Sequence, residues 1–174
     1  MLSVGDLAPP FHVQPVFGLP VTTGGRPLAV LFLRSLSGSL ARAAIAEATK
    51  ALPRLHAAGG QMVGFTRCDL TLARDFVPRN HVLFPIVVEP DDARFEAWGV
   101  GRDKALARSA ASLLAPASLR TLSTALPLGR ARPESGWDRL GAQFLVGPDG
   151  RVRYARYART IFNLPDVEGL CAAL

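Results

Sequence analysis

Apolar and polar positions along the chain predict strands and helices in turn. Leu28–Arg34 is apolar almost throughout, which is typical of a strand that is covered on both faces of its sheet. From Ser39 to about Ala57 the apolar residues recur at helical spacing, and we expect Gly59 and Gly60 to end this helix. A buried strand followed by an amphipathic helix favours an α/β fold.

The rest of the chain continues this alternation with shorter elements. Strands are expected at 13–21 (as a loose hairpin at a sheet edge), 61–66, 85–88, 142–146 and 152–157. Helices are expected at 71–76, 91–98, 104–114, 116–126 and 165–174. Thr71 is expected to cap the first of these helices, which should stop before Pro78, and Pro165 to open the last one. We predict a single α/β domain over residues 1–174.

Composition narrows the class of protein. A hydrophobic content of 49% and a mean hydropathy of +0.21 fit a globular chain that can bury a core. The longest unbroken apolar run, 28–33, is too short to cross a bilayer, so we expect no contact with a membrane. The first residues, Met1–Asp6, lack the basic start of a signal peptide, which favours a cytoplasmic protein.

Arginine carries most of the positive charge. The chain has 20 Lys and Arg against 14 Asp and Glu, a net charge of +6, and only Lys50 and Lys104 are lysines. No acidic residue lies between Asp6 and Glu47, so this region could attract an anion or an acidic protein partner, although solvated arginines without a partner are the simpler explanation. The wealth of Arg, Ala, Gly and Pro leans toward a bacterial source. No nucleic-acid motif accompanies the arginines, and we expect no nucleic-acid partner.

Five segments, in this order, resemble one known family. They are Val4-Gly-Asp-Leu-Ala-Pro-Pro-Phe11, Leu31-Phe-Leu-Arg34, Phe84-Pro-Ile-Val-Val-Glu-Pro-Asp-Asp92 with Ala97-Trp-Gly-Val100, Phe144-Leu-Val-Gly-Pro-Asp-Gly-Arg-Val-Arg-Tyr154 and Asn163-Leu-Pro-Asp166. The chain resembles the peroxiredoxin-like branch of the alkyl hydroperoxide reductase and thiol-specific antioxidant family. The resemblance implies a thioredoxin-like fold of three α/β/α layers around a central mixed sheet, with an extra helical segment around 104–126. It also implies a homodimer, for which that segment offers apolar helical faces.

The chain departs from the family pattern at the turn where thiol chemistry would occur. Members of this branch that perform it resemble Phe-Leu-Arg-His-x-x-Cys-Pro-x-Cys-Arg. On this pattern Arg34 and Arg42 match, but the first cysteine falls on Gly38, the proline on Ser39 and the second cysteine on Ala41. A peroxidase needs a thiolate that becomes a sulfenic acid, and serine is a weak nucleophile without a neighbouring base. The resemblance therefore predicts a non-catalytic, antioxidant-family protein that acts by binding.

The same turn could hold a small anion. The backbone N–H groups that begin a helix have no partners within it, and the helix dipole favours negative charge there. The expected binding residues are Arg34, Ser35, Ser37, Gly38, Ser39 and Arg42. In the alternative, Ser37 or Ser39 caps the helix and satisfies these donors without a ligand.

Cys68 offers a second hypothesis, a thiol oxidoreductase with a relocated redox cysteine. It follows the predicted strand 61–66, and the carboxyl ends of parallel strands meet at one edge of a sheet, which would place Cys68 on the rim that holds the Ser35–Ser39 turn. Arg67 and the next helix could lower its pKa. The simpler interpretation is a small, half-buried residue at the end of a strand.

The remaining candidates are weaker. Cys171 forms a formal prenylation signal with the last three residues, but a cysteine on the apolar face of a terminal helix explains it better. His12, His56 and His81 are scattered without ligand spacing, so we expect no metal site and no cofactor.

Overall fold

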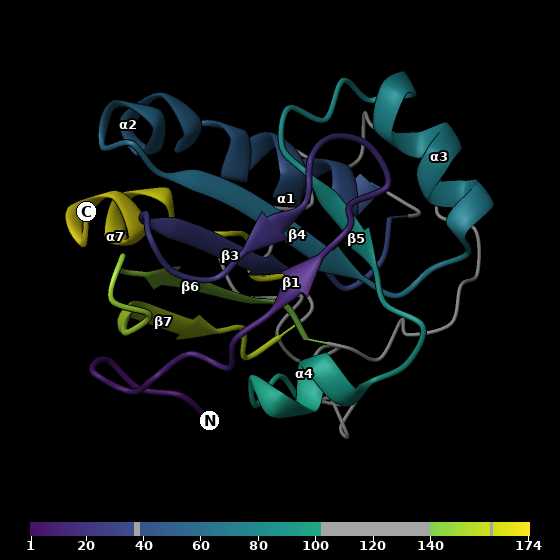
Figure 1. The fold of residues 1–174 in the computed structure, drawn as a ribbon. Helices are drawn as coiled ribbons and strands as arrows, with labels where there is room; N and C mark the ends of the chain where they lie inside the picture. Colours follow the sequence, from purple (N-terminus) through teal and green to yellow (C-terminus); the bar gives the residue numbers. More distant parts are fainter. Residues whose placement is uncertain (37–38, 102–139, 161) are drawn as a thin grey trace.

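A mixed five-stranded sheet forms the centre of the computed structural model, which describes residues 1–36, 39–101, 140–160 and 162–174 (Figure 1). Its strands are β3 (Leu28–Phe32), β4 (Gln61–Thr66), β5 (Ile86–Val88), β6 (Ala142–Val146) and β7 (Val152–Tyr157). The order across the sheet is β5-β4-β3-β6-β7, so β3 is the middle strand, as the sequence predicts. It runs parallel to β4 and antiparallel to β6.

Helices cover both faces of this sheet. They are α1 (Ser39–Thr49), α2 (Leu52–Ala57), α3 (Leu70–Arg79), α4 (Ala93–Ala97) and α7 (Val167–Ala172). Leu31 and Leu145 point to the face where α1, α2, α3 and α7 pack, whereas Val30 and Phe144 point to the face of α4. Figure 1 shows α4 on the opposite side of the sheet from α1 and α2. This layered α/β arrangement confirms the expected thioredoxin-like fold.

The apolar run of β3 packs into hydrophobic clusters on both faces of the sheet, which explains why it forms the middle strand. All five residues of β3 are buried, and successive side chains enter opposite clusters because a strand alternates its faces. On the α4 face, Phe32 stacks on Phe65 and meets Phe95 and Phe144 edge to face, with ring centroids 5.0–6.0 Å apart. Such aromatic pairs add stability beyond their buried area.

Two helices differ from the sequence expectation. The helix expected over 39–57 is divided into α1 and α2, because Pro53 lies in the first turn of α2, where its missing N–H costs nothing. Helix α3 is capped by Asp69, whose Oδ1 accepts from the backbone N–H of Thr71 at 2.7 Å and of Leu72 at 3.3 Å. It also continues through Pro78 to its end at Arg79.

The chain ends differ as well. The expected edge hairpin forms a separate two-stranded antiparallel sheet of β1 (His12–Val13) and β2 (Val21–Thr22). The last helix starts at Val167, after Pro165, because Asp166 is its N-cap and accepts from the N–H of Gly169. The helices expected at 104–114 and 116–126 lie outside the described residues, and the homodimer stays a prediction.

Candidate functional site

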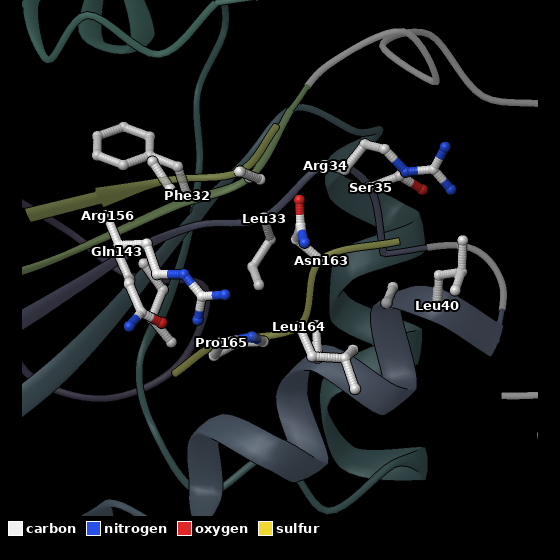
Figure 2. A pocket seen from close by; sticks show the side chains of 16 residues that line it. Phe32, Leu33, Arg34, Ser35, Leu40, Gln143, Arg156, Asn163, Leu164 and Pro165 are labelled. Carbon is white, nitrogen blue, oxygen red and sulfur yellow. The ribbon is translucent and has the colours of Figure 1, made fainter. Parts of the chain in front are cut away.

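A cavity of about 60 Å³ opens at the carboxyl end of β3, between the sheet and the start of α1 (Figure 2). Five segments of the chain form its walls. They are the segment that follows β3, helix α1, the first residues of β6, the end of β7 and the segment before α7. The lining residues are 31–35, Leu40, Ala41, Ala44, 141–143, Arg156, Ala158 and 163–165. Segments far apart in the sequence therefore meet at this one point.

The pairing of β3, β6 and β7 determines which polar side chains of the sheet line the cavity. Gln143 of β6 lies directly opposite Leu31 of β3 on one side and Arg156 of β7 on the other. Residues opposite each other in an antiparallel pair project to the same face, so these three form one row across three strands. The row brings an amide and a guanidinium to the face that α1 covers.

Gln143 is a buried polar residue whose amide is fully engaged. Its side chain is 3% exposed, and its Nε2 donates to the hydroxyl of Tyr154 at 3.1 Å and to the carbonyl of Asp166 at 2.9 Å. Its Oε1 accepts from the backbone N–H of Asp166 at 2.8 Å. These bonds attach the segment before α7 to the sheet and so position the wall formed by residues 163–165.

Asp166 stabilises the same corner with its carboxylate. Oδ1 accepts from the N–H of Gly169 at 3.0 Å, and Oδ2 accepts from the hydroxyl of Tyr154 at 2.8 Å. These two bonds, in that order, and the charge of Arg156 hold the pKa of Asp166 below its usual value. Burial, and then the neighbouring Asp166, raises the pKa of Tyr154. At neutral pH the corner therefore contains a carboxylate and an intact phenol.

Asn163 has a fixed orientation at the cavity. Its Oδ1 accepts from the backbone N–H groups of Arg159 and Thr160, both at 2.9 Å, and from the Thr160 hydroxyl at 3.3 Å. Because backbone N–H groups can only donate, the atom that faces them is the oxygen, and the amide nitrogen must lie on the other side. Figure 2 shows that oxygen pointing away from Pro165.

The predicted turn residues meet the cavity only in part. Arg34 and Ser35 line it, although Figure 2 shows the Arg34 guanidinium directed away from Asn163 and Arg156. Ser39 and Arg42 are outside the lining, and the buried Nε of Arg42 has no hydrogen-bond partner in the part of the chain that the structure describes. Ser37 and Gly38 lie outside the described residues.

The sequence analysis missed the residues that contribute most of the polar wall: Gln143, Arg156 and Asn163. A signal for the first was present, since Gln143 interrupts an otherwise apolar strand and a buried amide needs partners. Arg156 belongs to a run of arginines in and around β7, and no local feature separates it from its neighbours.

Cys68 does not line the cavity. It follows β4 at the expected sheet edge, is half-buried and packs against the apolar cluster on the α1 face. Arg67 is ion-paired with Asp92, so its charge is already engaged. Cys171 of α7 packs against the same cluster. No disulfide joins the two cysteines.

The described residues contain neither a cluster of metal ligands nor a helix that could span a membrane. No group of three or more His, Cys, Asp or Glu side chains in this part of the chain is placed to hold a metal ion. No helix among the described residues combines the length and the apolar character needed to cross a membrane.

The sequence of this chain matches a known protein family. Residues 48–160 match the model of the AhpC/TSA antioxidant enzyme family. No curated protein matches the sequence. Solved structures that resemble the fold include a peroxiredoxin Q mutant of Xylella fastidiosa, with 15% identity and a TM-score of 0.64 over 99% of this chain and 92% of that one.

Two more solved structures show the same likeness. A peroxiredoxin-like protein from Aquifex aeolicus has 13% identity and a TM-score of 0.65, covering 99% of this chain and 88% of its own. A putative thiol:disulfide interchange protein DsbE from Chlorobium tepidum has 18% identity and a TM-score of 0.65, with 99% and 96% covered. At these identities the likeness establishes the fold.

Proposed function

Since the chain belongs to the AhpC/TSA antioxidant enzyme family, we propose that it is a member without a peroxidatic cysteine, which acts by binding a small molecule without covalent chemistry. The lining of the cavity at the end of β3 carries the proposal. The described residues that line it include no cysteine, histidine, aspartate or glutamate. The site thus offers shape and hydrogen bonds, but neither a nucleophile with a base nor a general acid.

The chemistry of peroxide reduction supports this assignment. The reaction needs a thiolate that attacks the peroxide oxygen and becomes a sulfenic acid. The position that resembles the family's first cysteine is Gly38. Ser35 does line the cavity, but a serine hydroxyl needs an adjacent base to become a nucleophile.

The relocated-thiol hypothesis receives less support. Cys68 packs into the apolar cluster rather than into the cavity, and the guanidinium of Arg67 is paired with Asp92. The cation that this hypothesis relies on, the Arg67 guanidinium, is therefore already paired with a carboxylate.

Peroxide consumption tests the proposal directly. Hydrogen peroxide and dithiothreitol are incubated with the wild-type protein, Cys68→Ser and Cys171→Ser, and peroxide is followed over time. We expect the same rate in all three samples as with dithiothreitol alone. The proposal would be overturned if the wild type consumed peroxide faster than this background and Cys68→Ser did not. That result would establish Cys68 as the relocated redox thiol, and the mass of the intact protein would then show its oxidation.

We also propose that the protein is cytoplasmic and, from the family resemblance, that it is a homodimer. Light scattering across a range of protein concentrations tests the oligomeric state. A monomer mass at every concentration would refute the dimer.

A further inference from the structure

We propose that the cavity binds a short monocarboxylate, whose charged group is held by Arg156 and by the amide nitrogen of Asn163. This inference rests on the binding function proposed above and names its ligand class. Three features of the lining support it: which donors remain available, how Arg156 is held, and where the apolar wall lies.

The first feature is that the available polar groups are donors. Both hydrogens of Gln143 Nε2 are committed to Tyr154 and Asp166, so this buried amide has no donor left for a ligand. The oxygen of Asn163 is engaged by backbone N–H groups, which leaves its Nδ2 with two hydrogens. Nδ2 and the guanidinium of Arg156 then present donors and positive charge, and a carboxylate accepts both.

The second feature is the way in which Arg156 is held. Its Nη1 lies 3.6 Å from Oδ2 of Asp166, and among the described residues this single long contact leaves the remaining N–H groups of the guanidinium for another acceptor. Oδ1 and Oδ2 of Asp166 are themselves satisfied by Gly169 and Tyr154. The planar guanidinium can therefore keep this contact and still offer two parallel N–H groups to a carboxylate.

The third feature is an apolar wall close to these donors. Leu33 and Pro165 lie beside Arg156, and Leu40 lies toward the opposite end of the cavity (Figure 2). Ala44 and Leu164 complete the apolar lining. A second carboxylate placed against this wall would lose its hydration without gaining a partner, which disfavours dicarboxylates. A tetrahedral oxyanion has no apolar part to contact the wall and would place charged oxygens against it, which disfavours that class as well. A volume of about 60 Å³ admits only a few heavy atoms. The fitting ligand has one carboxylate and a short hydrocarbon tail.

Titration with propionate tests the inference. The probe is sodium propionate, added to ¹⁵N-labelled protein at constant ionic strength and pH 7, with propionamide and sulfate as comparison ligands. We expect saturable shifts of the amide signals of residues 141–143, Arg156, Ala158, Asn163 and Leu164, with a Kd on the order of 1 mM. Propionamide, which has the same shape without the charge, and sulfate should each bind at least about tenfold more weakly.

Variants separate the roles of the two donors. Arg156→Gln removes the positive charge. Asn163→Asp keeps an oxygen that accepts from the N–H groups of Arg159 and Thr160, but it replaces the donor Nδ2 by a negatively charged oxygen. Each substitution should weaken propionate binding at least about tenfold. Arg156→Lys keeps the charge without the planar fork and should fall between them and the wild type. Arg153→Gln is the matched control, because Arg153 lies on the same strand, pairs with Asp149 and is outside the lining.

Several outcomes would overturn the carboxylate inference. They are equal binding of propionamide, stronger binding of sulfate, unchanged binding in Arg156→Gln, or no saturable shift with propionate. Thermal unfolding of each variant checks that it is folded, and Arg156→Lys keeps the test valid if Arg156→Gln unfolds. If propionate does not bind and the protein also shows no peroxide turnover, only the ligand class is refuted. If the protein consumes peroxide through a thiol, the proposed function itself is refuted.

Discussion

The side-chain amide of Gln143 pairs with the backbone of Asp166 at two points. Nε2 donates to the carbonyl at 2.9 Å and Oε1 accepts from the N–H at 2.8 Å, in the manner of a neighbouring strand. The pair joins β6 to the start of α7, although 23 residues separate its members. It thereby determines where the wall of residues 163–165 stands relative to the sheet.

Gln143→Leu should destabilise the protein by about 2 kcal/mol, because it leaves buried donors and acceptors around Asp166 without partners. Urea unfolding of the variant and the wild type measures the difference. Gln14→Leu is the control, since Gln14 is exposed and should change the free energy of unfolding by less than about 0.5 kcal/mol. Equal effects of the two substitutions would contradict the structural role of the pair.

Gly169→Ala should also be destabilising, by about 1–3 kcal/mol, although alanine usually favours a helix. A Cβ at this position would lie 2.5 Å from Oδ2 of Asp166 and 2.9 Å from the Tyr154 side chain. Gly101→Ala is the control, since its Cβ would meet no atom of the described residues within 4 Å. Thermal unfolding compares the two variants, and a raised Tm in Gly169→Ala would show that the corner has more room.

Acid should remove the stabilisation that comes from Asp166. Because its folded pKa is lowered below the usual carboxyl value, the ionised group contributes stability above pH about 4, and this contribution is lost as the pH falls through the folded pKa. The difference in unfolding free energy between wild type and Asp166→Asn should be largest at pH 5–7 and shrink toward pH 3. Urea titrations at four pH values measure it. A difference that stays constant over this range would contradict the assignment.

A second polar pair supports the opposite face of the sheet. The guanidinium of Arg94 is ion-paired with the buried Glu89 and stacks over the rings of Phe11 and Phe65, 5.2 and 5.0 Å from their centroids. Arg94→Met should cost about 3 kcal/mol, because it leaves a buried carboxylate without its cation. The double variant Arg94→Met with Glu89→Leu should recover most of this loss in urea unfolding. A double variant no more stable than the single one would show that ring stacking outweighs the ion pair.

Local pattern was enough to predict most of the fold. The apolar run of β3 can be buried only between two layers, and the turn at Gly150, where φ is +77°, joins the hairpin of β6 and β7. Capping details were harder to predict, because Asp69 and Thr71 are both good N-cap residues and only the backbone at Asp69 adopts the extended conformation of a cap.

The sequence by itself determined most strands and helices of this protein, through the spacing of its apolar residues, and its resemblance to a known family implied the thioredoxin-like fold. It also determined that no cysteine occupies the turn at Gly38. Only the tertiary structure decided which polar residues line the cavity. Gln143, Arg156 and Asn163 lie in three separate segments, and the register of β6 with β7 and the pairing of Gln143 with Asp166 bring them together. The physical reason is that hydrophobic periodicity is encoded locally, whereas a site made of donors from different strands exists only after the strands have paired.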